Sequence, residues 1–343
     1  MTTQTRETTI RNQATAPTSQ VMPGSADVSA HGSRSARRRR FTKHSPAGEV
    51  VLAYLDAQAA RLSALDLAVR RDKPDAVHQM RVTVRRLRST LQSFTGIIPK
   101  AETSHLRAEL KWLGGVLGGA RDNEVLADHL HAGLKAVPTE LVLGPAQARI
   151  TKYFAPLEVS ARKEVLDALD SERYLTLRAD LARLLGSPPL TPAAAQPAGK
   201  VLPQDVGRAY RRTRRRMGAA SHAPAGQAGD VALHEARKAA KRAQYAAETA
   251  RPGLGKKAGK RARQLTKRMK DVQSTLGSHQ DAVIARGTAR DIGVQAHLAG
   301  ENAFSFGLLH ERAHRQAIAC AHQARREWRR ASGKKYRGWL PKS

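Results

Sequence analysis

Two segments of this chain carry histidine, arginine and lysine at a spacing that places them along one side of a helix. In 77–91, VHQMRVTVRRLRSTL, the side chains on that side are His78, Arg81, Arg85 and Arg88, which span about 15 Å of helix. In 233–247, LHEARKAAKRAQYAA, they are His234, Arg237, Lys241 and Gln244. The first three pairs are each separated by 156 residues. Guanidinium, ammonium and imidazole groups donate hydrogen bonds to phosphate oxygens, so this repeated side predicts binding of a polyanion.

An ordinary solvent-facing helix surface is the alternative interpretation of such a basic side. It usually mixes charges of both signs, because like charges at i,i+4 cost about 0.2–0.5 kcal/mol per pair. No Asp or Glu lies between His78 and Lys100. The basic side also runs beside an apolar seam, which packing would bury: Val77, Met80, Val84, Leu87, Leu91 and Phe94. A destabilising arrangement that occurs twice therefore favours an anion-binding surface.

Further basic residues occur at helical spacing elsewhere. One set lies beside the seam formed by Ala258, Ala262, Leu265, Met269, Val272 and Leu276, and consists of Lys256, Lys260, Arg263, Lys267 and Lys270. The helix before the second histidine carries Arg208, Arg211, Arg212 and Arg215, and the first half supplies Arg107 and Lys111. Together with Arg86 and Arg242, these residues suit phosphate groups that have no fixed sequence.

The elements that position these side chains are predicted to be helices. Apolar periodicity indicates helices at about 48–71, 76–95, 144–169, 171–185 and 301–331, and another follows the leucines that begin at Leu106. Gly118 and Gly119 predict a break, after which Asp122 would cap a new helix. The same break is expected at Gly277 and Asp281. The Pro/Ala-rich segment 187–203 reads as a linker between two halves with the same plan.

Composition limits the class of protein. The 343 residues include 60 Lys+Arg against 29 Asp+Glu, a formal charge of +31, which an anionic partner would screen. Aromatic residues make up 4%, so the core must consist mainly of Ala, Leu and Val. The lone Cys320 excludes an internal disulfide framework. The chain has no apolar stretch of membrane-spanning length and no signal-peptide core, so we expect a soluble, cytoplasmic protein without a membrane partner.

These motifs resemble the CHAD family, the conserved-histidine α-helical domain. The resemblance lies in HxxRxxxRRxR at 78–88, in HxxRxxxKR at 234–242, and in LGGARDNEVL and LGSHQDAVIA. It covers about residues 46–335, and Gln244 departs from it where the first copy has Arg88. It implies an all-α fold of two pseudo-symmetric helical bundles, duplicated four-helix-type halves, with a basic central channel. It also implies non-catalytic binding of inorganic polyphosphate through the basic-histidine motif, which falls on His78, Arg81, Arg85, Arg86, Arg88, His234, Arg237, Lys241 and Arg242.

The resulting division of the chain has three parts. A disordered basic arm is expected at 1–45, ending in Arg37–Arg40, and a basic tail at 336–343. The CHAD domain between them would comprise 46–186, the linker 187–203, and 204–335. No ExExK signature of the CYTH domain that often accompanies this family occurs in the chain. The expected role is association with polyphosphate granules or regulation of polyphosphate metabolism, and the sequence leaves the oligomeric state undetermined.

Several alternatives stay open at the level of sequence. His78 and His234 could be structural or bind a metal, although the arginines around them would repel a cation. His310–His314 reads HERAH, which satisfies the HExxH zinc motif, but Arg312 and Arg315 surround it and no third ligand follows. We therefore expect no metal and no cofactor. Nonspecific DNA or RNA binding is the main alternative function, although few aromatic residues are present to stack on bases. For an enzyme acting on phosphate polymers, Asp122 and Asp281 are the only candidate carboxylates, and a helix-capping role suits them better.

Overall fold

The computed structural model describes residues 40–341, and within that range the chain is helical. Ten α-helices, three short 3-10 helices and one isolated β-bridge between Pro46 and Pro197 account for its regular structure. The all-α fold expected from the sequence is therefore confirmed. None of the helices in this range is both long and apolar enough to cross a membrane.

The first half contains five α-helices, and the bounds of four of them, all except α3, agree with the apolar periodicity to within about two residues. They are α1 (Ala47–Arg70), α2 (Ala76–Ser93), α3 (Ser104–Lys135), α4 (Ala146–Asp170) and α5 (Glu172–Gly186), with the 3-10 helix η1 (Thr139–Leu141) before α4. Helix α2 starts directly after Asp75, which adopts a left-handed conformation with φ of 61°. This sharp turn sets the direction of the helix that carries the first histidine motif.

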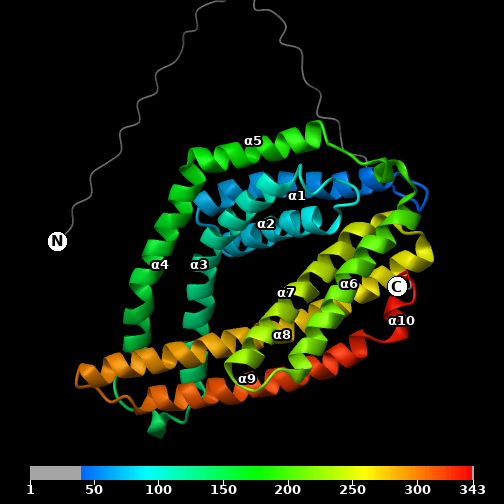
Figure 1. Cartoon of the computed structure of the whole chain (residues 1–343). Coiled ribbons are helices and arrows are strands. Elements are labelled where there is room, and N and C mark those ends of the chain that lie inside the picture. The colour runs from blue at the N-terminus through cyan, green and yellow to red at the C-terminus, as the bar shows by residue number, and fades with distance from the viewer. Residues whose placement is uncertain (1–39, 342–343) are drawn as a thin grey trace, which may run out of the picture. The chain divides into compact units, whose positions relative to one another are not determined.

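The second half also contains five α-helices. After η2 (Pro192–Ala195) it contains α6 (Ala198–His222), α7 (Gln227–Ala250), η3 (Arg251–Gly253), α8 (Lys256–Leu298), α9 (Phe304–Ala331) and α10 (Lys334–Arg337). In Figure 1, α8 and α9 run side by side below the lower ends of α3 and α4. The pseudo-two-fold relation between the halves stays a prediction.

The glycine-rich breaks predicted after Leu117 and Leu276 are wrong. Helices α3 and α8 continue through Gly118 and Gly277, and neither Asp122 nor Asp281 caps a helix. A Cβ atom at Gly118 would lie 3.5 Å from Nη2 of Arg81, and one at Gly277 would lie 3.3 Å from Nη2 of Arg237. The glycines therefore let a guanidinium group lie against the neighbouring helix backbone, in the same way in both halves.

The segments expected to be irregular contain ordered structure. Residues 187–203 are more than a linker, because α6 begins at Ala198 and the Ala198 side chain is fully buried. Residues 40–45 of the expected arm are ordered: Ser45 and Lys43 accept backbone hydrogen bonds from Ala198 and Gly199. In the expected tail, Trp339 and Leu340 pack against the core. Residues 1–39, 342 and 343 lie outside the described residues.

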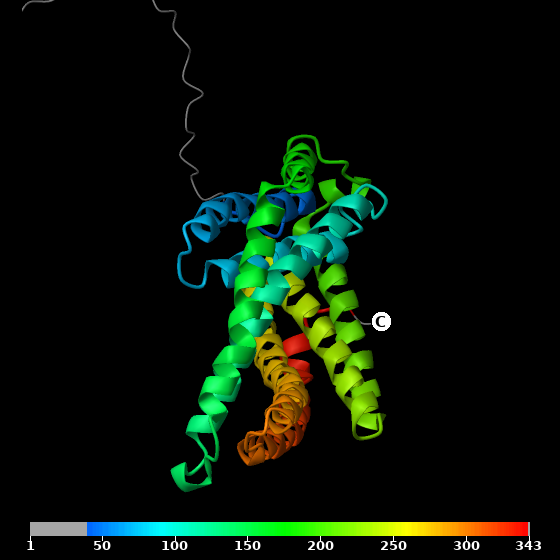
Figure 2. The same ribbon diagram turned by 90° about the vertical axis from the view of Figure 1, so that its left-hand side faces the viewer.

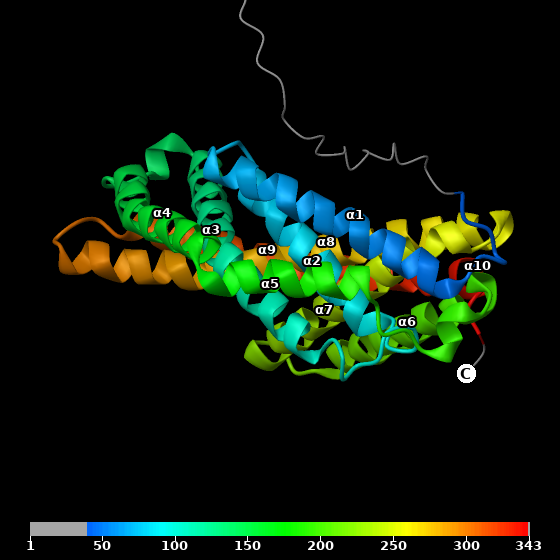
Figure 3. The same cartoon turned by 90° about the horizontal axis from the view of Figure 1, so that it is seen from above.

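Two apolar cores share α3, α4, α8 and α9. The larger one joins α1, α2, α5, α6 and α7 with the N-terminal parts of α3 and α8 and the C-terminal parts of α4 and α9. The smaller one forms where the C-terminal parts of α3 and α8 meet the N-terminal parts of α4 and α9, with Phe154 and Phe306 among its buried side chains. Figure 2 shows α4 and the α6–α7 hairpin on opposite sides of α8 and α9, and in Figure 3 α5 lies along α1. The larger core therefore brings α2 and α7, the two histidine helices, into contact.

Candidate functional site

A cavity of about 730 Å³ lies between α2, α7 and α8. Helix α7 presents Arg237 and Lys241 to it, and α8 adds Arg263 and Lys270. The basic residues that the sequence singled out and that line this cavity are His78, Arg85, Arg86, Arg237, Lys241, Arg263 and Lys270. Side chains from both histidine motifs, more than 150 residues apart in the chain, therefore face one space.

Lys241 is the residue most affected by this crowding. Burial lowers its pKa to about 6, and the cationic side chains of Arg85, Arg237 and Arg81 act in the same direction, opposed only by Asp281. Burial likewise lowers the pKa of Arg237, with Arg85 and Arg81 contributing and Asp281 and Asp122 opposing. The Nε atom of Arg237 is buried without a hydrogen-bond partner among the described residues. The site thus holds more positive charge than its own carboxylates balance, which favours an anionic ligand.

Three carboxylates lie among these cations. Asp122 accepts a hydrogen bond of 2.7 Å from Nη1 of Arg81, and Glu248 lies 3.3 Å from Nη2 of Arg86. Burial raises the pKa of Asp281, while the nearby Arg237 opposes that effect. Asp122 and Glu248 therefore pair with guanidinium groups, and neither Asp122 nor Asp281 has the helix-capping role expected from the sequence.

The two motif histidines have different surroundings. His78 lines the cavity, and its Nδ1 atom is buried without a hydrogen-bond partner in the described part of the chain. Burial lowers the pKa of His78; Asp75 opposes this effect, and Arg121 and Arg85 reinforce it. His234 does not line the cavity, and its Nδ1 atom lies 2.8 Å from Oε1 of Gln280 on α8. Of the two imidazoles, only His78 is placed to meet a ligand in this space.

The remaining basic candidates lie outside the cavity. Four of them have charges close enough to affect Arg242 or are Arg242 itself, and we call them the Arg242 cluster: Arg88, Arg107, Arg212 and Arg242. Other candidates are engaged elsewhere or face solvent: Arg208 pairs with Asp205, Arg211 lies near Gly207, and Lys111, Arg215, Lys260 and Lys267 are exposed away from the cavity. The basic line expected along α6 therefore contributes a single residue, Arg212, to either group.

Comparison with known proteins decides which family this arrangement belongs to. The model of the CHAD domain family matches residues 53–290, which is more than half of the chain and includes both histidine helices. The chain belongs to the CHAD family. The expectation drawn from the paired motifs is thereby confirmed.

Relatives and solved structures place this CHAD protein more closely. It is 34% identical over 314 residues to the uncharacterized proteins MT2285 and Rv2226 of two Mycobacterium tuberculosis strains, covering 88% of this chain and 58% of each relative. The chain thus spans little more than half the length of these relatives. Among solved structures, it resembles PptA from Streptomyces chartreusis with a TM-score of 0.69 and 24% identity, over 83% of this chain and 100% of PptA. The CHAD domain from the plant Ricinus communis gives a TM-score of 0.56 and 25% identity, over 91% and 97%.

Sequence reasoning missed several residues of the CHAD cavity. Tyr245 and Glu248 follow Lys241 by four and seven residues, so helical spacing alone places them on the same face of α7. The Tyr245 hydroxyl accepts a hydrogen bond of 3.3 Å from Nε of Arg85. Glu248 also accepts a hydrogen bond of 3.2 Å from the Tyr54 hydroxyl. The other lining residues that had not been singled out are Val82, Arg251, Thr266, Gln273, Ser274 and Ser278.

The HERAH sequence lies on α9, where Arg286 of α8 contacts both imidazoles. The backbone oxygen of Arg286 lies 3.0 Å from Nδ1 of His310, and its Nη1 atom lies 3.1 Å from Nδ1 of His314. Because guanidinium can only donate, Nδ1 of His314 accepts this hydrogen bond. Glu311 pairs with Arg315 at 2.7 Å. These contacts give the segment a role in joining α8 and α9.

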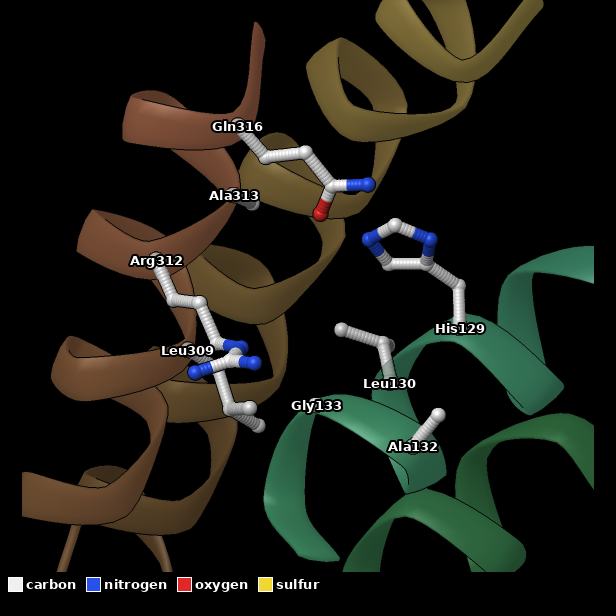
Figure 4. Close-up of a pocket in the computed structure, with 8 residues that line it drawn as sticks. All are labelled: His129, Leu130, Ala132, Gly133, Leu309, Arg312, Ala313 and Gln316. Atoms are coloured by element: carbon white, nitrogen blue, oxygen red, sulfur yellow. The ribbon is translucent and has the colours of Figure 1, made fainter. Parts of the chain in front are cut away.

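A separate small pocket of about 190 Å³ lies between α3 and α9. Figure 4 shows the His129 ring, the Arg312 guanidinium and the Gln316 amide around this space, with Leu130 and Leu309 below them. Burial lowers the pKa of His129; Asp281 opposes this effect, and Arg312 reinforces it. With one cationic side chain and a small volume, this pocket has much less positive charge than the cavity between α2, α7 and α8.

Proposed function

We propose that this CHAD protein binds inorganic polyphosphate in the cavity between α2, α7 and α8. One observation carries the proposal: Arg85, Arg237 and Lys241 come from two histidine motifs and crowd into one space despite their mutual repulsion. A dense, flexible polyanion relieves that repulsion, and counterion release from the polymer adds to its affinity. The family resemblance implies the same ligand.

The proposed activity is binding without a covalent step. Asp122 pairs with Arg81, and Asp281 lies beside Arg237, so these carboxylates serve the arginines as counterions. Within the cell, such binding would serve association with polyphosphate granules or control of access to the polymer. Stacking on bases would require exposed aromatic rings, and Tyr245, the aromatic residue among those lining the cavity, is buried and hydrogen-bonded by Arg85.

Charge reversal tests this proposal. Replacing Arg81, Arg85, Arg237 and Lys241 by Glu should abolish binding of long-chain polyphosphate in a calorimetric titration while helicity is retained. Reversing the four arginines at 37–40 removes the same number of positive charges and should cost far less. Equal losses from the two sets would indicate attraction by diffuse charge instead of a formed site.

A competition experiment separates the two ligand classes. Long-chain polyphosphate should displace duplex DNA from the purified protein, whereas DNA at the same concentration of phosphate groups should displace little polyphosphate. Both ligands weaken with salt, so the comparison must be made at one ionic strength. Stronger retention of DNA would overturn the proposed ligand.

A further inference from the structure

Three hydrogen-bonding side chains converge on the small pocket between α3 and α9: His129 of α3, and Arg312 and Gln316 of α9. In Figure 4 the imidazole lies opposite the Gln316 amide, and the Arg312 guanidinium group lies one turn away on α9. Arg312 is also close enough to His129 for its charge to act on the imidazole. Two helices that are distant in the chain therefore direct polar groups into one space.

None of these three side chains forms a hydrogen bond or an ion pair with another residue of the range 40–341. The two histidines and the glutamate of the HERAH sequence, by contrast, all have partners. Arg312 is thus the polar side chain of that sequence that is still available to a ligand. Its guanidinium group can only donate hydrogen bonds, so the ligand must supply acceptors.

The opposite side of the pocket is apolar. Leu130 and Leu309 are almost completely buried and lie below the three polar groups in Figure 4. The two helices approach closely at Gly133, where a Cβ atom would lie 3.0 Å from Cδ2 of Leu309. Ala132 and Ala313 complete the lining. A ligand in this space therefore meets hydrogen-bond donors on one side and a packed apolar surface on the other.

The charge and the volume of the pocket define the chemical class of its ligand. A guanidinium fork matches a carboxylate group with two parallel hydrogen bonds, and a single cation balances a single negative charge. None of the described residues that line the pocket is Asp or Glu, and Asp281, whose charge also acts on His129, lines the cavity instead. A volume of about 190 Å³ corresponds to about six water molecules of about 30 Å³ each, and hence to about six non-hydrogen atoms.

We propose that the pocket between α3 and α9 binds a short aliphatic carboxylate of about the size of butyrate, which has about six non-hydrogen atoms. Arg312 holds the carboxylate group, His129 and Gln316 donate to its oxygens, and the alkyl chain lies on Leu130 and Leu309. A neutral imidazole suffices for this role, because it still carries one N–H donor. The ligand differs from that of the proposed function, since polyphosphate has no apolar part and more charge than one guanidinium group balances.

Nuclear magnetic resonance titration of the full chain with formate, acetate, propionate and butyrate at one pH and ionic strength tests this proposal. Affinity should rise about threefold to fourfold per added methylene group, because each group buries apolar surface against the leucines. Hexanoate should gain nothing over butyrate, since the pocket is then full. The Cε1–H resonance of His129, identified by its loss in His129→Gln, should shift with the bound fraction and so locate the ligand in this pocket.

Two variants separate the charge of the pocket from its volume. Arg312→Gln removes the guanidinium group at an exposed position and should weaken butyrate binding about tenfold or more, the effect of losing charge-assisted hydrogen bonds. Ala132→Leu keeps all three donors but fills space from an exposed position, and it should block butyrate while formate still binds. Arg329→Gln removes an exposed charge of the same helix outside the pocket and should leave butyrate binding unchanged. Circular dichroism checks that each variant is folded.

The possible outcomes are distinct. Equal affinities from formate to butyrate, or butyrate binding retained in Arg312→Gln, would place the anion elsewhere and overturn the proposal. Inorganic phosphate that shifts the His129 resonance at lower concentration than butyrate would also overturn it, because the pocket would then be a phosphate site. These titrations contain no polyphosphate, so their failure leaves the proposed function of the cavity intact, and a failure of polyphosphate binding leaves the carboxylate site intact.

Discussion

Replacing Lys241 by methionine should remove a specific pH dependence from the stability of the empty protein. The lysine side chain is held partly buried among Arg81, Arg85 and Arg237, and burial with these charges lowers its pKa to about 6 from the usual 10.5. In the unfolded chain no such environment exists. Between pH 6 and 10.5 the unfolded state therefore binds a proton that the folded state does not hold.

The sign and size follow from this difference. Since the unfolded state binds more protons in this window, the free energy of unfolding rises with pH, and the contribution of Lys241 is lost as pH falls from 10.5 to about 6. One proton corresponds to about 1.4 kcal/mol per pH unit. The half-buried position of Lys241 makes that value an upper limit. From pH 7.5 to 8.5 the free energy of unfolding of the wild type should therefore rise by up to about 1.4 kcal/mol more than that of Lys241→Met.

Urea unfolding of both proteins at pH 7.5 and 8.5 measures this difference directly. Other groups that titrate in the interval are present in both proteins, so their effects cancel in the comparison. Methionine retains the length of the apolar stem without the amine, and the variant should also be the more stable protein at pH 7.5. An equal pH dependence of the free energy of unfolding in the two proteins would refute the deduction that Lys241 is neutral in the empty site. It would also contradict the inference that neighbouring cations and burial disfavour its charge.

Three other predictions follow from the same geometry. Polyphosphate affinity should rise as pH falls from about 8 to 6, because the bound polyanion raises the pKa of both His78 and Lys241 from their lowered values. At constant ionic strength, the double variant His78→Ala/His234→Ala should reduce the pH dependence of the affinity without abolishing it. An unchanged pH dependence would make both histidines structural. Gly277→Ala should displace the Arg237 guanidinium group and weaken polyphosphate binding. Gly287 is an exposed position of the same helix with open space around it, so Gly287→Ala should stabilise the fold by about 1 kcal/mol and leave binding unchanged. Equal binding by both variants would contradict the role assigned to Gly277. Burial lowers the pKa of His279, which lies 3.2 Å from Asp230, so the free energy of unfolding should fall as pH drops below about 6.5. The accompanying fall in melting temperature should be smaller in His279→Gln. An identical fall in the variant would assign the acid sensitivity to other groups.

The helices and their buried sides were predictable from the sequence because apolar spacing follows helix geometry directly. Met80, Val84, Leu87 and Leu91 are all buried, as their intervals of three and four indicate. The repeated cationic side was predictable for the same reason. The two copies differ at Gln244, where the first has Arg88, and in the structure Gln244 lines the cavity whereas Arg88 does not.

What failed to follow from the sequence depends on contacts between distant segments. A glycine pair is typical of a helix end, yet α3 continues through Gly118, and the guanidinium group of Arg81, 37 residues away, lies against it. The packing of α2 against α7 likewise determines which basic side chains become neighbours. Consecutive residues such as Lys241 and Arg242 then have different surroundings, since Lys241 lines the cavity and Arg242 does not.

The two cores share helices, α8 among them, and this has a consequence for how the domain unfolds. At 43 residues, α8 is about 65 Å long, and it supplies Leu276 to the larger core and Ile292 to the smaller one without interruption. Neither core can lose its packing without releasing a helix on which the other depends. Protection of backbone amides from hydrogen exchange should therefore be similar at both ends of α8, and the domain should open as one cooperative unit.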